Sequence, residues 1–361
     1  MNILVVCSVI NFRDFTRRAT IEAIKKEVDN LDVLFYTGIK NFLKKKITVD
    51  GIRFLTYHFW VPDKFKRIKF FGFIEHKIRG LYWSKKILKY DIVFITDPNQ
   101  AWLLSYIKQS KIVYLLRDPN ILQNKNNSST EKILLLKSNT VLATSKNLAN
   151  NYVPRFYGIE CKYIYYWPNC VDINIWDNTK YLRNRFNATK IIGVAGNFDK
   201  IRTDYLLLDY ITSQRTDLIF EIAGTIDYNQ SKTFWDNLLS KKNVKYLGFV
   251  PFDLLPKVVA KWNVGLITDK IDIYSSYMHH NKVYQYLSLG IPVVSLRIHH
   301  DYDDFYPCVQ LVPDKEQYLI AIRFAIDELQ NHSIEDTCIT YAKLNSSEER
   351  AKTFLNIVNK S

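Results

Sequence analysis

Short apolar runs alternate with helical stretches along almost the whole chain, and this alternation limits the fold more than any other feature. Runs that are typical of buried parallel strands lie at Ile3–Val9, 33–36, 91–96, 111–116 and 139–143, and again at 190–196, 218–224, 244–250 and 264–268. Strands that alternate with helices predict parallel sheets with helices on both faces. The sequence therefore predicts an α/β chain with two doubly wound, Rossmann-like domains that face a central cleft.

The chain has 361 residues, which is long enough for two domains of ordinary size. The stretch 165–178 carries Pro and Asn turn signals and is a good candidate for the linker. We expect an N-terminal domain at 1–170, a C-terminal domain at 171–345 and a terminal helix at 346–361 that packs back toward the first domain.

Cysteine usage and hydropathy exclude several classes of protein. The five cysteines are odd in number and scattered, which argues for a reducing cytosol and against a disulfide framework or a zinc site. No uncharged apolar run reaches eighteen residues, so no transmembrane helix is expected. The N-terminus lacks a basic region and a cleavage site, and it predicts a first strand and not a signal peptide.

The positive charge lies in the N-terminal half. Residues 1–180 hold 29 Lys and Arg against 15 Asp and Glu, whereas residues 181–361 hold 21 of each. Much of the excess falls in Lys64–Lys89, where nine basic residues are interleaved with aromatic residues and a single acid, Glu75. Such a segment suits an anionic membrane surface, where rings bury at the headgroup level and cations meet phosphates. A solvated basic helix and a site for single-stranded nucleic acid are the alternatives.

The stretch from His279 to Ser295 predicts a phosphate-binding helix start. It reads H-H-N-K-V-Y-Q-Y-L-S-L-G-I-P-V-V-S, with Asn281 as a candidate N-cap and Gly290 as the residue that stops the helix. Free backbone N–H groups at a helix start bind anions, and Lys282 adds a positive charge there. The same pattern is compatible with a helix–strand connection that binds no ligand.

Ligands of open α/β sheets lie beyond the carboxyl ends of the strands. In the second half of the chain this rule predicts one rim, formed by Gly196 and Asn197, Gly224 and Thr225, Phe249 to Pro251, Thr268, and Asn281 with Lys282. Glycine at several of these positions allows the backbone to approach a ligand closely.

Six motifs follow one another along the chain: L-A-T-S-K-N-L at 142–148, W-P-N-C-V-D at 167–172, V-A-G-N-F at 194–198, I-A-G-T at 222–225, N-V-K-Y-L-G-F-V-P at 243–251 and N-K-V-Y-Q-Y-L-S-L-G-I-P-V-V at 281–294. Their order and spacing resemble those of a GT-B glycosyltransferase of family 4, particularly bacterial polysaccharide and surface-glycan enzymes with a shortened donor motif. The resemblance implies sugar transfer, retaining or inverting, from a nucleotide-sugar without an essential metal or other cofactor. The second domain would bind the donor, and the first would bind the acceptor.

The resemblance also implies roles for individual residues. Lys282 falls on the lysine of the family hallmark, and Arg202 falls on the lysine that meets the donor diphosphate. Asn197 stands where an arginine is usual, and Gln285 stands where a glutamate holds the donor ribose. Tyr277 takes the place of the earlier glutamate of the longer motif, and the first loop lacks the family's glycines.

Transfer needs cations at the leaving diphosphate and, for inversion, a base for the acceptor hydroxyl. Asp118 and Asp97 each follow a predicted strand, and an aspartate before a proline often starts a turn. We expect Asp97 to cap a turn; Asp118 is the candidate base, and a turn role suits it equally. Arg17 and Arg18 are candidates for an acceptor phosphate, and surface roles suit them equally. The predicted catalytic set is Asp118, Arg202 and Lys282, and the predicted donor-binding set is Gly196, Asn197, Gly224, Thr225, Phe249, Val250, Thr268, Asn281 and Gln285.

We therefore expect a cytoplasmic glycosyltransferase, peripheral on the inner face of the plasma membrane, that uses a UDP-sugar and a lipid-linked or lipopolysaccharide-type acceptor. The alternatives are a nucleic-acid-binding or DNA-modifying protein, a degenerate GT-B subunit that assists an active partner, and a sugar-nucleotide epimerase. No nucleic-acid motif supports the first alternative, and Gln285 motivates the second. The sequence predicts no oligomeric state.

Overall fold

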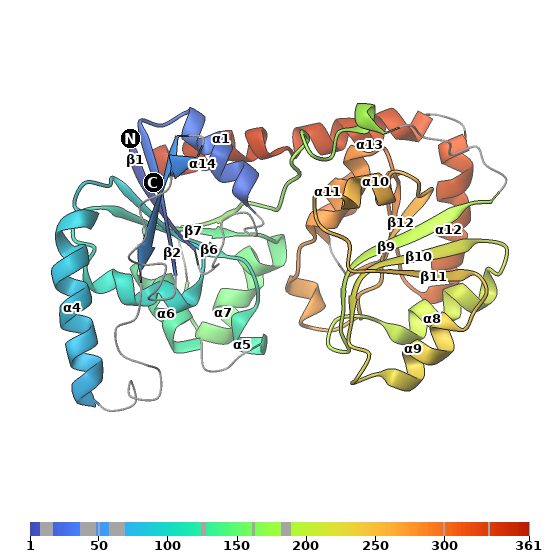
Figure 1. Cartoon of the computed structure of the whole chain (residues 1–361), viewed down its shortest axis with the longest axis horizontal. Coiled ribbons are helices and arrows are strands. Elements are labelled where there is room, and N and C mark those ends of the chain that lie inside the picture. Colours follow the sequence, from blue (N-terminus) through green and yellow to red (C-terminus); the bar gives the residue numbers. More distant parts are fainter. Residues whose placement is uncertain are drawn as a thin grey trace. The chain divides into compact units, whose positions relative to one another are not determined.

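Two parallel β-sheets organise the computed structural model, which describes residues 1–7, 17–36, 48–49, 51–57, 69–123, 128–160, 163–181, 189–298, 300–330 and 333–360. The first compact unit comprises Met1–Pro168 with Arg350–Ser361, and the second comprises Asn169–Glu349. Each unit is a sheet covered by helices on both faces, as the alternation of apolar runs predicts (Figure 1).

The first sheet has the strand order β3-β4-β2-β1-β5-β6-β7-β8, and all neighbours are parallel except β3 and β4. Its strands are β1 (Asn2–Cys7), β2 (Asn30–Tyr36), β3 (Thr48–Val49), β4 (Ile52–Tyr57), β5 (Ile92–Ile95), β6 (Lys111–Leu116), β7 (Thr140–Ala143) and β8 (Ile164–Tyr166). Its helices are α1 (Arg18–Lys26), α4 (Lys69–Ile87), η2 (Pro98–Ser105), α5 (Asn120–Gln123), α6 (Ser128–Lys137), η4 (Leu148–Tyr152) and α7 (Val153–Tyr157). Strands such as β5 are buried on both faces, which explains why they appear in the sequence as continuous apolar runs.

The last helix, α14 (Ser347–Lys360), completes the core of the first unit together with α1. The ring of Phe354 lies 5.1 Å from that of Phe94 in β5 and 5.8 Å from that of Trp167. The indole N–H of Trp167 also donates to the carbonyl of Arg350. These contacts bury the apolar stripe of a terminal helix that is otherwise rich in charge.

The second sheet has the order β11-β10-β9-β12-β13-β14, and every neighbouring pair is parallel. Its strands are β9 (Ile191–Phe198), β10 (Ile219–Ile226), β11 (Val244–Gly248), β12 (Val264–Ile267), β13 (Val293–Leu296) and β14 (Val309–Val312). Its helices are η5 (Asn178–Lys180), α8 (Tyr205–Gln214), α9 (Lys232–Leu239), α10 (Leu255–Val259), η6 (Ser275–Tyr277), α11 (Asn281–Ser288), η7 (His300–Phe305), α12 (Lys315–Gln330) and α13 (Ser333–Leu344). Side chains of α8, α9 and α12 share a core with one face, and those of α10, α11 and α13 share a core with the other.

Two glycines let large aromatic rings lie directly on the second sheet. A Cβ atom on Gly193 in β9 would lie 1.8 Å from the ring of Trp262, and one on Gly265 in β12 would lie 2.3 Å from the ring of Tyr286. The two rings are fully buried and meet edge to face at 5.7 Å. Tyr286 belongs to α11, so this packing sets how closely α11 approaches the sheet.

Candidate functional site

The carboxyl end of β9 opens into a small cavity. In this sheet β10 lies on one side of β9 and β12 lies on the other, so the strand order reverses at β9. Ligands of such sheets bind at the carboxyl ends of the strands where the order reverses. The cavity has a volume of about 170 Å³. It is lined by Gly196, Asn197, Phe198, Arg202, Thr203, Thr268, Asp269, His280 and Lys282.

Two predicted glycines shape the backbone beside this cavity. Gly196 and Gly224 are paired across β9 and β10 and have φ angles of 150° and 140°. A Cβ atom on Gly224 would lie 1.7 Å from the carbonyl oxygen of Gly196, so a side chain there cannot be accommodated. Next to them, Thr225 donates from its hydroxyl to Asn197 Oδ1 at 2.7 Å.

Lys282 carries a positive charge into the cavity from the first turn of α11. Its Nζ lies 3.7 Å from the position that a Cβ atom on Gly196 would occupy. Among the described residues, Nζ makes no hydrogen bond and no ion pair within 4.0 Å. Burial lowers the pKa of Lys282, and the charge of Arg202 lowers it further although Asp269 acts in the opposite direction. An anion in the cavity would supply the missing negative charge.

Arg202 is the second cation of the cavity, but it already has a carboxylate partner. Its Nε and Nη2 donate to Asp199 Oδ2 at 2.9 and 2.6 Å, and the other oxygen of Asp199 accepts from the backbone N–H groups of Ile201 and Arg202. Burial disfavours the charged guanidinium, yet the bonds and charge of Asp199 outweigh burial and raise the pKa of Arg202. Arg202 is therefore a fixed positive group whose charge is partly neutralised.

A histidine–aspartate contact closes the cavity on the β12 side. His280 Nε2 lies 2.6 Å from Asp269 Oδ2, and both side chains are almost buried. Asp269 also forms an antiparallel bridge with Thr203, which ties the loop after β9 to the end of β12. Sequence reasoning missed Asp269 and Thr203, although Asp269 directly follows the predicted residue Thr268 at a strand's carboxyl end.

The start of α11 differs from the sequence prediction in its cap. The helix begins at Asn281, the cap position belongs to His280, and no side chain caps the helix. The prediction of Asn281 as N-cap is therefore wrong, because the chain before the helix is held by other groups. The N–H of His280 donates to the hydroxyl of Tyr302 at 2.8 Å, and Asn169 donates to the carbonyl of His279 at 2.7 Å. The first backbone N–H groups of α11 have no partner within the helix.

The other end of α11 matches the prediction. Gly290 has a φ angle of 65° just after the last helical turn, and β13 follows from Val293. The hydroxyl of Tyr286 accepts from the backbone N–H of Ala195 at 2.9 Å. That bond fixes α11 to β9 one turn after Lys282.

The remaining predicted donor-binding residues lie outside the lining of this cavity. Phe249 is 71% exposed, and Val250 packs against the core that α11 shares. Gln285 is half-buried one helical turn after Asn281, and neither residue lines the cavity. The hydroxyl of Tyr246, a residue that sequence reasoning did not select, donates to the carbonyl of Gly224 at 3.0 Å.

The candidate base belongs to the first unit, directly after β6. Asp118 accepts a hydrogen bond from Arg117 Nε at 2.6 Å. Asp97 accepts from the backbone N–H of Asn99 and caps η2, so its predicted role in a turn is confirmed. Arg17 is buried, with its guanidinium 4.1 Å from the centre of the Trp167 ring.

A buried carboxylate lies beneath the loop that bears Asp118. Glu131 accepts from Asn120 Nδ2 and from the hydroxyls of Tyr114, Tyr152 and Tyr157. Burial raises the pKa of Glu131 even though these four bonds act against that rise. Asn120 also donates to the carbonyl of Asp118 at 3.1 Å, so Glu131 indirectly holds this loop.

The described residues contain neither a metal-ligand cluster nor a membrane-spanning helix. No three His, Cys, Asp or Glu side chains of the described part of the chain gather as a metal site would need. None of the described helices is both long and apolar enough to cross a membrane.

No protein-family model matches the sequence, and no curated protein matches it. Solved structures do resemble the chain. HepE of Anabaena in complex with UDP-glucose has a TM-score of 0.73 and 15% identity over 100% of both chains. The sucrose-phosphate synthase of Thermosynechococcus elongatus has a TM-score of 0.73 and 13% identity over 100% of this chain and 98% of its own. The lipopolysaccharide outer core galactosyltransferase WaaB has a TM-score of 0.66 and 13% identity over 100% of this chain and 99% of its own.

The chain has the GT-B fold. Both Rossmann-like units of a GT-B chain are present, and the predicted fold class is thereby confirmed at the level of its two domains. At these identities the likeness concerns the fold, so function must be argued from the site.

Proposed function

We propose that this GT-B chain is a glycosyltransferase of the family 4 type that uses a nucleotide-sugar, with a UDP-sugar as the preferred donor and without a metal ion. The observation that carries this proposal is the cavity at the end of β9, where Lys282 lies without a hydrogen-bonding or ion-pair partner among the described residues. The similar structures support the choice of donor, because HepE binds UDP-glucose and WaaB is a galactosyltransferase.

The chemistry requires stabilisation of a leaving diphosphate. The bond between the anomeric carbon and the β-phosphate oxygen breaks, and a bond to an acceptor hydroxyl forms while that hydroxyl loses its proton. Negative charge grows on the diphosphate as the bond breaks. Lys282 and Arg202, which line the cavity, and the N–H groups at the start of α11 would attract that charge.

Two side chains define the rest of the proposed donor and acceptor chemistry. Gln285 would bond the donor ribose with an amide, which gives a weaker bond than the charge-assisted one that a glutamate makes. If transfer proceeds with inversion, Asp118 is the candidate base for the acceptor hydroxyl, with Arg117 holding its carboxylate in place.

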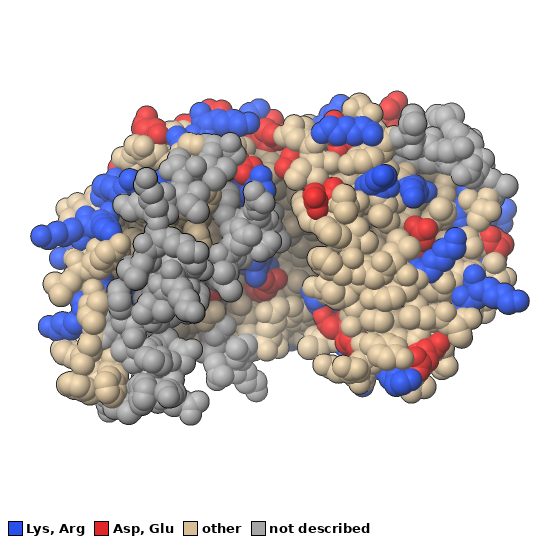
Figure 2. All heavy atoms as spheres, in the orientation of Figure 1, with Lys and Arg blue, Asp and Glu red and all other residues tan. Residues whose placement is uncertain are grey.

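The acceptor in this proposal is a lipid-linked or lipopolysaccharide-type glycan at the inner face of the plasma membrane. The outward face of α4 exposes Phe70, Phe73, Leu81 and Tyr82, of which Leu81 is 81% exposed. Lysines lie among them: Lys86 Nζ is 3.4 Å from the centre of the Tyr82 ring. Figure 2 shows Lys and Arg side chains along the edge of the first unit that α4 occupies in Figure 1, at the left of the view.

Exposed rings and lysines on one helix suit an anionic bilayer interface. Residues 64–68 of the predicted basic segment lie outside the described residues. The free cysteines among the described residues, Cys7, Cys170, Cys308 and Cys338, agree with a reducing compartment.

The test of the donor site is the release of nucleoside diphosphate from a panel of nucleotide-sugars, with UDP binding measured alongside. We expect Lys282→Ala to weaken UDP binding about 10-fold or more, because a charged hydrogen bond is lost. Lys257→Ala, which removes an exposed lysine of α10, is the matched control and should bind UDP like the parent. Failure of the parent protein to bind any nucleoside diphosphate would refute the proposal.

The test of the membrane surface is co-sedimentation with vesicles that contain anionic lipid. Leu81→Asp should reduce the bound fraction several-fold, because it places a carboxylate on the apolar face of α4. Leu344→Asp changes an equally apolar, 65% exposed residue of the second unit and should leave binding unchanged. Equal loss in both variants would contradict a role for α4.

A further inference from the structure

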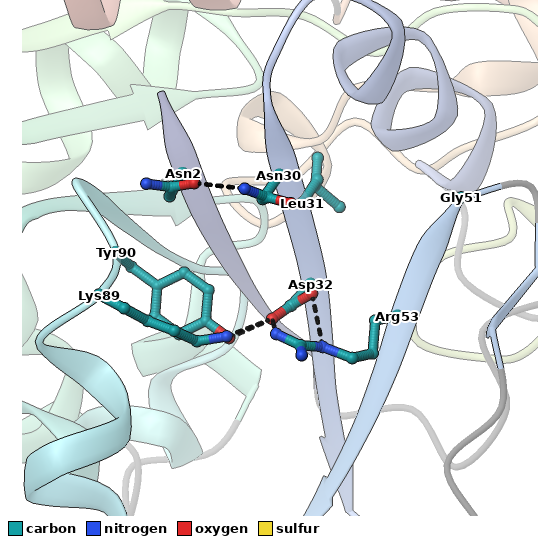
Figure 3. Close-up of a pocket in the computed structure, with 8 residues that line it drawn as sticks. All are labelled: Asn2, Asn30, Leu31, Asp32, Gly51, Arg53, Lys89 and Tyr90. Carbon is teal, nitrogen blue, oxygen red and sulfur yellow. Dashed lines mark hydrogen bonds and ion pairs between the residues drawn. The ribbon is translucent and has the colours of Figure 1, made fainter.

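A second cavity lies at the amino ends of the strands of the first sheet, whereas the loop that carries Asp118 lies at their carboxyl ends. It has a volume of about 510 Å³ and lies at the amino ends of β1 and β2 and the start of β4. Its lining is Asn2, Asn30, Leu31, Asp32, Gly51, Arg53, Lys89 and Tyr90 (Figure 3). Since Asp118 follows the carboxyl end of a parallel strand of the same sheet, this cavity cannot be part of the acceptor chemistry at Asp118.

One buried carboxylate holds the cationic side chains of this cavity. Asp32 Oδ1 accepts from Arg53 Nε at 3.1 Å, and Oδ2 accepts from Arg53 Nη2, Lys89 Nζ and the hydroxyl of Tyr90. Burial disfavours the charged form of Asp32, but these bonds outweigh burial and lower its pKa. Asp32 is therefore an anion with its bonds satisfied, and it fixes two cations beside it.

The cavity has more donors than Asp32 uses. The bonds to Asp32 leave Arg53 Nη1 and two of the three Nζ hydrogens of Lys89 unused, while these side chains are 40% and 49% exposed. Asn2 accepts from Asn30 through Oδ1 at 2.8 Å, so its Nδ2 is turned away from that bond. Two positive groups and one negative group leave a net positive charge at the mouth of a polar cavity.

We propose that this cavity binds a phosphate group, as a phosphomonoester or phosphodiester, through Arg53, Lys89 and the amide of Asn2. A guanidinium held by a carboxylate at one edge presents its remaining N–H groups in a fixed fork, which matches the oxygens of phosphate. The lysine supplies a second charge without a strict geometric demand. Preorganisation by Asp32 reduces the conformational entropy that phosphate binding costs.

The position of the cavity suggests one source for the phosphate. Lys89 comes two residues after the last residue of α4, and Leu88 between them is 48% exposed. A phospholipid headgroup could therefore enter the cavity while α4 contacts the bilayer. This source depends on the membrane association proposed above, whereas binding of a soluble phosphate compound does not.

The first test measures binding of inorganic phosphate and glycerol 3-phosphate to the full chain by calorimetry, against chloride at equal ionic strength. We expect binding to weaken about 10-fold in Lys89→Gln, which removes a charged donor. Asn2→Asp should weaken it as well, since it keeps the acceptor for Asn30 and adds a negative charge. Lys108→Gln, an exposed lysine of the same unit outside the cavity lining, is the charge-matched control and should bind like the parent.

The second test adds vesicles to separate the two sources. If Lys89→Gln loses both the binding of soluble phosphate and the selectivity for anionic vesicles, the ligand is a headgroup. If the variant loses only the binding of soluble phosphate, the ligand is a free phosphate compound. Leu81→Asp should abolish vesicle binding and keep phosphate binding, so failure of the membrane proposal is distinguishable from failure of this one. The proposal is overturned if Lys89→Gln and Asn2→Asp bind phosphate like the parent, or if the parent does not prefer phosphate to chloride.

Discussion

Removal of a single hydroxyl group from Tyr286 tests how the donor helix is held. Backbone N–H groups in the middle of a sheet normally donate to carbonyl groups of the neighbouring strands. Strand β12, however, pairs with β9 only at Ile192 and Gly193. Beyond that point the hydroxyl of Tyr286 accepts from the N–H of Ala195 at 2.9 Å, and Tyr286 is fully buried. Tyr286→Phe keeps the ring on Gly265 and removes only this acceptor.

The cost follows from leaving a buried N–H group without its partner. Loss of an acceptor in this situation costs about 1–3 kcal/mol, and about 2 kcal/mol corresponds to a fall in Tm of roughly 4–8 °C for a unit of this size. Lys282 lies one turn earlier on the same helix. We therefore expect UDP binding to weaken in Tyr286→Phe, although the hydroxyl does not line the cavity.

Thermal unfolding followed by circular dichroism, with calorimetric UDP titration, measures both effects. Tyr228→Phe is the matched control: its hydroxyl donates to Asp236 on the surface, Tyr228 is 39% exposed, and its loss should change stability by less than about 0.5 kcal/mol. Equal Tm values for the parent, Tyr228→Phe and Tyr286→Phe would refute the reasoning.

Three further predictions concern other parts of the chain. Gly224→Ala should lower the free energy of unfolding by about 3 kcal/mol or more, measured by denaturant unfolding, because the new Cβ would lie 1.7 Å from the Gly196 oxygen. Gly158→Ala is the control: Gly158 also has positive φ but no atom lies within 4 Å of its Cβ position, so it should lose only about 1 kcal/mol. Similar losses in the two variants would contradict this. Diphosphate favours charged Lys282, so UDP affinity should be greatest below the lowered pKa of Lys282 and fall as pH rises through it, starting below 10.5; Lys282→Arg should show a flatter pH profile in titrations, and parallel profiles would count against the assignment. Because the pKa of Glu131 is raised, its contribution to stability is present below pH 4.5 and is lost as pH rises through the folded value, so the Tm of the parent relative to Glu131→Gln should fall over that range; a rise would be the opposite of what the burial argument requires.

Much of the fold could be predicted because its strands are buried on both faces. Continuous apolar runs such as Ile92–Ile95 and Val293–Leu296 are visible without any knowledge of their neighbours. Gly290 was predictable for a similar reason, since a residue with positive φ at a helix end is usually glycine. The helix start was not, because the N–H of His280 is held by Tyr302, a residue 22 positions away.

The candidate site could be predicted where one strand end carries the signal. Gly196 and Thr268 follow from the rule that ligands lie at the carboxyl ends of strands, and Lys282 follows from the helix start. The partnership of Arg202 with Asp199 could not be inferred, because a side chain's choice of partner depends on loop geometry. The second cavity could not be predicted from the sequence, because Asp32 bonds to Arg53 and Lys89, which are 21 and 57 residues away along the chain.

The two glycines beneath Trp262 and Tyr286 restrict how this chain can change. Each glycine and its ring fill one shared volume, so a methyl group at Gly193 requires a smaller residue at position 262, and a methyl group at Gly265 requires one at position 286. Replacement of Tyr286 would also remove the hydroxyl that bonds Ala195. Gly265 therefore affects the placement of Lys282 through Tyr286 and the bond of its hydroxyl to Ala195. A substitution at Gly265 would be neutral only if a smaller residue replaced Tyr286 and another group took over the bond to Ala195.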